Sequence, residues 1–155
     1  MVIGGDDMPE NLFYEWEDAK KKRITNAGID EFSKYGYING STNRIVRNSG
    51  ISKGSLFQYF QNKEDLYFYI LDTVTLEFGL SLSDSSDNLS EDPFQRVIEY
   101  SEMEFSWYMR NPEKYKIIVD AFTKNDSDIY QKIKEKYGLA GETTYYKLFE
   151  GIDLK

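Results

Sequence analysis

Apolar positions recur along the chain with the spacing of amphipathic helices. From Leu12 to Tyr35, apolar side chains fall about every 3.6 residues, which predicts one long helix. Gly36 follows the last apolar residue and can adopt the left-handed conformation that ends many helices. Strict alternation of apolar and polar residues, which is typical of strands, is not sustained anywhere in the sequence. The pattern therefore predicts an all-α fold.

The next apolar periodicity is shorter. It predicts a helix over residues 43–49, with Ser41 or Thr42 as its N-cap and Gly50 at its end. Both cap candidates carry a hydroxyl that can accept a hydrogen bond from a backbone N–H of the first turn. A compact helix of this length needs the rest of the fold to hold it in place.

The remainder of the chain is also helical in pattern. A fourth helix is predicted from the cap residue Asn62 to about Leu80, and an acidic, serine-rich loop of about a dozen residues follows it to Pro93. Further helices are predicted over residues 94–110, from Pro112 onward, over residues 128–137 and over residues 142–150, with Gly138 and Gly141 separating the last two. Apolar residues of the 94–110 helix lie on two stripes, so we expect it to be buried or to line a cavity.

Composition excludes several kinds of site. The chain has 155 residues and contains neither cysteine nor histidine, so disulfides and thiolate metal sites are excluded and the commonest metal ligand is missing. We expect no metal and no cofactor. No apolar run approaches the roughly 18 residues of a membrane helix, and the N-terminus lacks the regions of a signal peptide. A cytoplasmic protein without a membrane partner is therefore expected.

Charge is distributed unevenly along the sequence. The net charge is −8, but residues 20–63 hold nine Lys/Arg against two acids, which is +7 and leaves −15 for the rest of the chain. Such a division is typical of a basic nucleic-acid footprint on an acidic protein. A solvated basic helix face would give the same count, so charge alone leaves both interpretations open.

The segment 41–60 reads STNRIVRNSGISKGSLFQYF. Ile51 occupies the turn after the 43–49 helix, and Ser52 can cap a further helix over residues 53–60. A helix, a tight turn and a second helix form the motif that places its second helix in the major groove of DNA. The segment therefore predicts a helix-turn-helix.

Several stretches between residues 20 and 71 share the pattern of one family. They are Ile24, Ala27 and Phe32; Gly36-Tyr37; Thr42 and Ile45; the run from Gly50 to Phe60; and the run from Asn62 to Leu66. Over residues 20–71, about a third of the chain, the sequence therefore resembles the N-terminal DNA-binding domain of the TetR family of bacterial transcriptional repressors. Val46 and Ser49 stand where the family usually has alanine.

The resemblance implies a TetR-type DNA-binding domain over residues 15–72, with its helix-turn-helix at 41–60. It also implies phosphate or base contacts from nine positions. These are Thr42, Arg44, Lys53, Gly54, Ser55, Phe57, Gln58, Tyr59 and Lys63. Phe57 replaces a tyrosine whose hydroxyl commonly donates to phosphate in the family, so Phe57 can offer only an apolar contact.

Residues 73–155 carry no motif that can be matched. The resemblance implies a long helix leading into a helical effector-binding and dimerisation domain. Family members are usually longer and dimerise through two C-terminal helices, so we expect this domain to be truncated and a homodimer to need those helices. Six aromatic residues are candidates to line an effector pocket, with simple core packing as the alternative: Tyr100, Phe105, Trp107, Tyr108, Tyr115 and Phe122.

The sequence thus predicts a ligand-responsive repressor that binds a palindromic double-stranded DNA operator as a dimer and releases it when a small-molecule effector binds. The alternative is a helical protein-interaction module with little DNA binding. An enzyme built on Glu99, Glu102 and Glu104 is disfavoured, because no nucleophile, phosphate loop or metal set accompanies these carboxylates.

Overall fold

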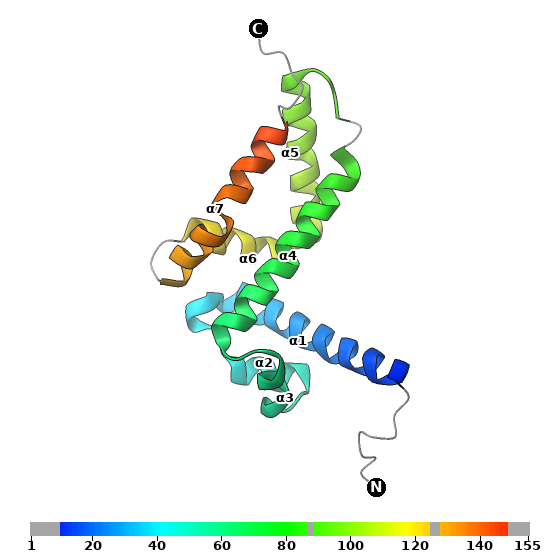
Figure 1. The fold of residues 1–155 in the computed structure, drawn as a ribbon. Helices are drawn as coiled ribbons and strands as arrows, with labels where there is room; N and C mark the ends of the chain where they lie inside the picture. The colour runs from blue at the N-terminus through cyan, green and yellow to red at the C-terminus, as the bar shows by residue number, and fades with distance from the viewer. Residues whose placement is uncertain (1–9, 87–88, 125–127, 149–155) are drawn as a thin grey trace. The chain divides into compact units, whose positions relative to one another are not determined.

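The computed structural model describes residues 10–86, 89–124 and 128–148. Within these ranges the chain forms seven helices and no strand, so the predicted all-α fold is confirmed (Figure 1). The chain divides into two compact units, with the boundary between Ile70 and Leu71 inside α4. No helix of the described ranges is both long enough and apolar enough to cross a membrane.

The first unit contains the predicted helix-turn-helix. Its elements are α1 (Glu10–Asn39), α2 (Thr42–Ser49), α3 (Lys53–Tyr59) and the first turns of α4 (Lys63–Ser86). Helix α1 is interrupted at Gly36, whose φ of 67° and ψ of −179° lie outside the helical region. Positive φ is accessible to glycine at little cost, and the interruption confirms that the long helical run ends at this position.

Local caps explain where the short helices begin. The Ser41 hydroxyl accepts from the backbone N–H of Arg44, so Ser41 rather than Thr42 is the N-cap of α2. Ser52 caps α3 by accepting from Ser55 N at 3.0 Å. Between the two helices, Gly50 takes the left-handed conformation with φ 66° and ψ 27°. The turn of the helix-turn-helix is therefore fixed by local chemistry that the sequence displays.

An apolar core holds these short helices against α1 and α4. Phe32 of α1 meets Tyr67 of α4 edge to face, with ring centroids 5.0 Å apart. Ile45 of α2 and Leu56 of α3 are almost fully buried. Because α3 has only seven residues, this packing rather than intrinsic propensity keeps it helical.

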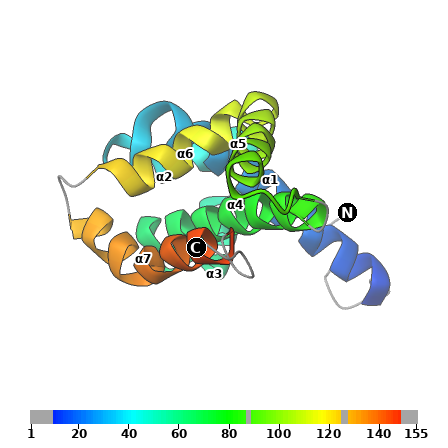
Figure 2. The same ribbon diagram turned by 90° about the horizontal axis from the view of Figure 1, so that it is seen from above.

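The second unit contains the rest of α4 with α5 (Pro93–Arg110), α6 (Pro112–Thr123) and α7 (Asp128–Leu148). Helix α6 packs against both α5 and α7 (Figure 2). The largest core side chains of the second unit are those of Leu71, Val74, Leu82, Tyr100, Trp107, Ile117, Ile129, Tyr130 and Ile133. Proline is the first residue of both α5 and α6, where its missing N–H removes no helical hydrogen bond.

Two predicted boundaries in this unit are wrong. Helix α4 continues to Ser86, so the expected loop from Ser81 is much shorter. Leu82 is buried in a cluster with Tyr100, and this packing outweighs the low helix propensity of the serines around it. Helix α7 runs through Gly138 and Gly141 as one helix instead of two. A glycine weakens a helix by only about 1 kcal/mol, so it does not have to end one. The sequence also predicts that Asn125, Asp126 and Ser127 cap the helix from residue 128, and these residues lie outside the described ranges.

Helix α5 buries one of its two predicted apolar stripes. Tyr100 and Trp107 are buried, with exposed fractions of 8% and 3%. Phe94 and Phe105 on the other stripe are 82% and 63% exposed. The expectation that α5 is buried or lines a cavity is therefore met in part. One face is buried and Met103 lines a hollow, but the described residues leave Phe94 and Phe105 uncovered.

Two glycines give a matched stability test. A Cβ at Gly40 would lie 2.7 Å from the Phe32 ring and 2.8 Å from the backbone oxygen of Gly36. We expect Gly40→Ala to cost about 1–3 kcal/mol through overpacking. A Cβ at Gly79, on the exposed side of α4, meets nothing within 4 Å, so Gly79→Ala should add about 0.5–1 kcal/mol of helix stability.

Thermal unfolding followed by circular dichroism would measure both changes. A lower Tm for Gly40→Ala and a higher one for Gly79→Ala are expected. Equal Tm values for wild type and Gly40→Ala would show that the connection between α1 and α2 is not closely packed.

Candidate nucleic-acid interface

Helix α3 separates its buried and exposed residues sharply. Leu56 faces the core and is 1% exposed. Lys53, Gly54, Phe57 and Gln58 are all exposed. Four of the nine predicted DNA-contact residues therefore lie on the outer side of one rigidly packed helix. This is the arrangement that a recognition helix requires.

Ser55 and Tyr59 of α3 are less exposed. The Ser55 hydroxyl, 3.0 Å from Ser52 Oγ, is half-buried beside the N-cap. The Lys53 ammonium lies 6.0 Å from the centre of the Phe57 ring. Phe57 thus adds an apolar surface next to a cation, in the place where the family usually has a tyrosine hydroxyl. Neither observation tests contact with DNA, which stays a prediction for these residues.

Tyr59 has an intramolecular partner. Its hydroxyl hydrogen-bonds the carboxylate of Glu17 in α1. Burial is the largest cause and the hydrogen bond to Glu17 the second, and they raise the pKa of Tyr59 to about 12. The hydroxyl is therefore protonated at neutral pH and acts as a donor. A phosphate contact from Tyr59 would have to replace the bond to Glu17.

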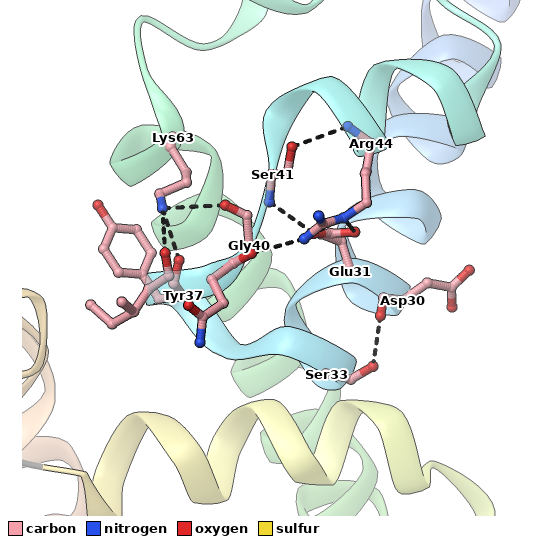
Figure 3. Close-up of polar contacts among 10 residues, drawn as sticks. Asp30, Glu31, Ser33, Tyr37, Gly40, Ser41, Arg44 and Lys63 are labelled. Atoms are coloured by element: carbon pink, nitrogen blue, oxygen red, sulfur yellow. Dashed lines mark hydrogen bonds and ion pairs between the residues drawn. The ribbon is translucent and has the colours of Figure 1, made fainter.

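Arg44 is turned towards the protein. Its Nε lies 2.9 and 3.0 Å from the two carboxylate oxygens of Glu31, and its Nη2 lies 2.6 Å from Oε1 and 2.8 Å from the Asn39 carbonyl (Figure 3). The guanidinium also stacks 4.3 Å from the centre of the Tyr35 ring. The hydrogen bonds to Glu31 raise the pKa of Arg44 further above its ordinary value. Arg44 thus has a structural role that its assignment to DNA did not anticipate.

Lys63, at the first position of α4, is also engaged. Its ammonium donates to the carbonyls of Tyr37, Ile38 and Gly40 at 2.9, 3.2 and 3.3 Å (Figure 3). It lies 4.6 Å from the centre of the Tyr37 ring. These carbonyls belong to the segment between the interruption of α1 and the start of α2, so Lys63 ties α4 to that segment.

The predicted residues therefore form two groups. One group lies on or at the ends of α3: Lys53, Gly54, Ser55, Phe57, Gln58 and Tyr59. The other surrounds the connection between α1 and α2, where half-buried Thr42 opens α2 and where Arg44 and Lys63 bind backbone carbonyls. Sequence reasoning did not identify Glu31 as part of this second group. The available signal was its helical spacing from Ile24 and Ala27, which places an acid on the apolar face of α1.

The six predicted pocket residues do not form a single lining. Tyr108 stacks on Tyr115 with centroids 4.0 Å apart, and Trp107 lies beside Tyr108. Phe105 is instead largely exposed, and Phe122 contacts Tyr137 edge to face. A hollow of about 480 Å³ is lined by other residues, namely Ser81, Leu89, Glu99, Glu102, Met103, Ser106 and Arg110. Tyr100 packs in the cluster with Leu82, so effector binding by these six residues stays a prediction.

The three carboxylates considered for catalysis are in different settings. Glu99 accepts from Ser90 N at 2.8 Å and from Gln95, and these bonds lower its pKa. Burial raises the pKa of Glu104, whereas Glu102 is exposed. Among the described residues, no group of three or more acidic side chains is arranged to hold a metal ion.

The Tyr59–Glu17 bond predicts a titration. Because the pKa of Tyr59 is raised from 10.0 to about 12, the unfolded chain loses this proton at lower pH than the folded chain. The contribution of Tyr59 to folding stability is fully present below pH 10 and is lost as pH rises towards 12. In a tyrosinate absorbance titration, the difference between wild type and Tyr59→Phe should have its midpoint near 12. A midpoint near 10.0 would contradict the bond between Tyr59 and Glu17, and Glu17→Gln should move the midpoint part of the way there.

Comparison with known proteins agrees with this geometry. A family profile described as bacterial regulatory proteins of the tetR family matches residues 24–70. The transcriptional regulator RutR of Escherichia coli K12 is 42% identical over 53 residues, which is 34% of this chain and 25% of RutR. The transcriptional repressor SCO4008 of Streptomyces coelicolor is 26% identical over 83 residues, 54% of this chain and 43% of the repressor. The match thus spans about a quarter of the length of RutR and less than half of that of SCO4008.

Solved structures show the same fold over more of the chain. A TetR-like transcriptional regulator from Rhodococcus sp. RHA1 has a TM-score of 0.68 at 18% identity, covering 84% of this chain and 69% of that one. A TetR family transcriptional regulator from Chloroflexus aurantiacus has a TM-score of 0.65 at 23% identity, covering 92% and 67%. The match to the tetR family profile thus lies over the helix-turn-helix region, and the solved TetR-like regulators share the fold of the described helices.

Proposed function

We propose that this chain is a sequence-specific DNA-binding transcriptional regulator that inserts α3 into the major groove. The observation that carries the proposal is the two-sided character of α3. Leu56 fixes the helix to the core, while Lys53, Gly54 and Gln58 face solvent. A rigid element that presents a cation, an amide and an unobstructed stretch of backbone matches what a groove offers.

The outward residues suit different parts of DNA. Lys53 can neutralise a phosphate, and Gly54 lets the backbone approach closely because it has no side chain. Gln58 has an amide that can both donate to and accept from a base edge, as adenine requires. Phosphate contacts would set register and affinity, and base-edge contacts from Ser55, Gln58 or Tyr59 would set sequence preference.

Charge supports the same reading. The first unit contains the segment 20–63 with its formal charge of +7, while the remainder of the chain carries −15. A positive field confined to the helix-turn-helix region attracts DNA to that region and orients the encounter.

Regulation belongs to the same proposal. A dimer would place two α3 helices in successive major grooves of a palindromic operator, about one helical turn apart. A small molecule bound to the second unit would favour a state with unsuitable spacing and so release the DNA. The similarity to the repressor SCO4008 supports repression as the direction of control. We propose a cytoplasmic location, because the operator lies there in bacteria.

One observation favours a second candidate, a helical protein-interaction module. Phe94, Ile98, Phe105 and Met109 are 82, 52, 63 and 69% exposed along α5. Exposed apolar stripes of this kind often mark protein interfaces. In this candidate the fold is the same, but the chain binds DNA poorly and acts through α5.

Fluorescence anisotropy with duplex DNA from upstream of the chain's own gene separates the two candidates. Lys53→Gln should weaken binding at least tenfold, and it should reduce the slope of log affinity against log salt by about 0.9 because one phosphate contact is lost. The matched control is Lys134→Gln, which makes the same charge change at an exposed site on α7. The control should bind like wild type.

The contradictory outcomes are distinct. No binding even at low salt would favour the protein-interaction module. Binding that Lys53→Gln and Lys134→Gln weaken equally would show general charge attraction without a recognition helix.

A further inference from the structure

The connection between α1 and α2 leaves several backbone groups without helical partners. Side chains satisfy them. Lys63 donates hydrogen bonds to the carbonyls of residues 37, 38 and 40, and Arg44 donates one to the carbonyl of Asn39. The N–H of Ser41 donates to Glu31 Oε1 at 2.8 Å. Three side chains therefore hold the segment that sets where α2 begins (Figure 3).

Glu31 is the most constrained of the three. Its side chain is only 2% exposed, and its carboxylate accepts three hydrogen bonds from Arg44 as well as the one from Ser41. An isolated buried carboxylate is very costly, so the guanidinium is the counter-ion that makes this position possible. Withdrawal of Arg44 would leave that charge uncompensated.

Contact with DNA through Nε or Nη2 of Arg44 would break these bonds. Its Nε and Nη2 are aimed at Glu31 and the Asn39 carbonyl, and one face of its guanidinium covers Tyr35. Its side chain is 36% exposed, which is enough for an edge to meet solvent. Two of the three guanidinium nitrogens are thus used inside the protein, and only the Nη1 edge is left for the phosphate contact that the family resemblance implies.

We propose that Glu31 and Arg44 are a positioning pair, which fixes α2 on α1 and thereby aims α3 at DNA, with Arg44 making no direct DNA contact. The inference rests on the proposed DNA-binding function. Arg44 lies in the first turn of α2, and α2 leads through the left-handed Gly50 directly into α3. A shift at the start of α2 is therefore carried to α3 within a few residues.

The variant Glu31→Gln removes the carboxylate charge, and the direction in which it changes DNA affinity distinguishes positioning from direct contact. If Arg44 bound phosphate, loss of its carboxylate partner would free the guanidinium and strengthen DNA binding. If the pair acts by positioning, Glu31→Gln should weaken binding about tenfold, because the bidentate charged contact is lost. The measurement is anisotropy with the same upstream duplex, over a salt series, at a temperature where circular dichroism shows each variant to be folded.

Arg44→Lys supplies the second test. A lysine retains the charge that a phosphate needs, but it cannot form the two-pronged contact with Glu31 and also reach the Asn39 carbonyl. We expect Arg44→Lys to lose about as much affinity as Glu31→Gln, the double variant to lose no more than either single one, and the salt slope to stay at the wild-type value. Lys53→Gln is the contrasting variant, because its salt slope should fall by about 0.9.

Three results would overturn the inference. The first is stronger binding by Glu31→Gln. The second is wild-type affinity for Arg44→Lys together with a reduced salt slope for Arg44→Gln. The third is wild-type affinity for both folded variants, which would limit the pair to a role in stability.

Failure of the proposed function would be recognised separately. If wild type binds no duplex, or if Lys53→Gln changes nothing, DNA binding by α3 is rejected. Amide hydrogen exchange then decides on the pair itself. Glu31→Gln should speed exchange at Ser41 and in α2 while leaving α6 unchanged, and unaltered protection at Ser41 would reject the pair.

Discussion

Glu31 places a carboxylate where water hardly reaches it, and three N–H donors, which form four hydrogen bonds, compensate for the lost hydration. Those donors come from the first turn of α2 and from the residue before it, so the charge in α1 can be satisfied in only one arrangement of the two helices. Apolar packing of Phe32 and Ile45 brings α1 and α2 together, but it is non-directional. The ion pair adds a directional contact that fixes the orientation of α2 on α1. A recognition helix needs a fixed orientation, because small errors of orientation separate its side chains from base edges.

Much of the helix-turn-helix could be predicted from sequence because its determinants are local. Ser52 and Gly50 each act within a few residues of their own position, through a hydroxyl cap and a left-handed turn. Glu31 and Arg44 are 13 positions apart, and no local rule pairs them. Arg44 was therefore assigned to DNA on the strength of its position in the family pattern. The structure shows an intramolecular use for the same charge.

The second unit shows the limits of periodicity more clearly. Spacing correctly predicted that 94–110 is helical, but it could not tell which of two apolar stripes would be covered. Tyr100 is covered because Leu82, in the part of α4 that looked like a loop, reaches it. Composition had assigned that stretch to a connection, since serine and aspartate favour turns. The packing of Leu82 with Tyr100 therefore explains both the length of α4 and the covered stripe of α5, and the sequence near either residue does not predict this contact.

The use of cations inside the fold changes how the basic segment should be understood. The +7 of residues 20–63 already sets Glu31 against Arg44, so this pair adds nothing to it, but it includes Lys63, which binds three carbonyls. A cation held in this way releases few counterions when DNA arrives, so it contributes little to the salt-dependent part of affinity. Such a cation contributes instead to the salt-independent part of DNA affinity, because it fixes the geometry in which exposed groups such as Lys53 and Gln58 meet the groove. Charge counts from sequence therefore overstate electrostatic attraction and understate orientation in this domain.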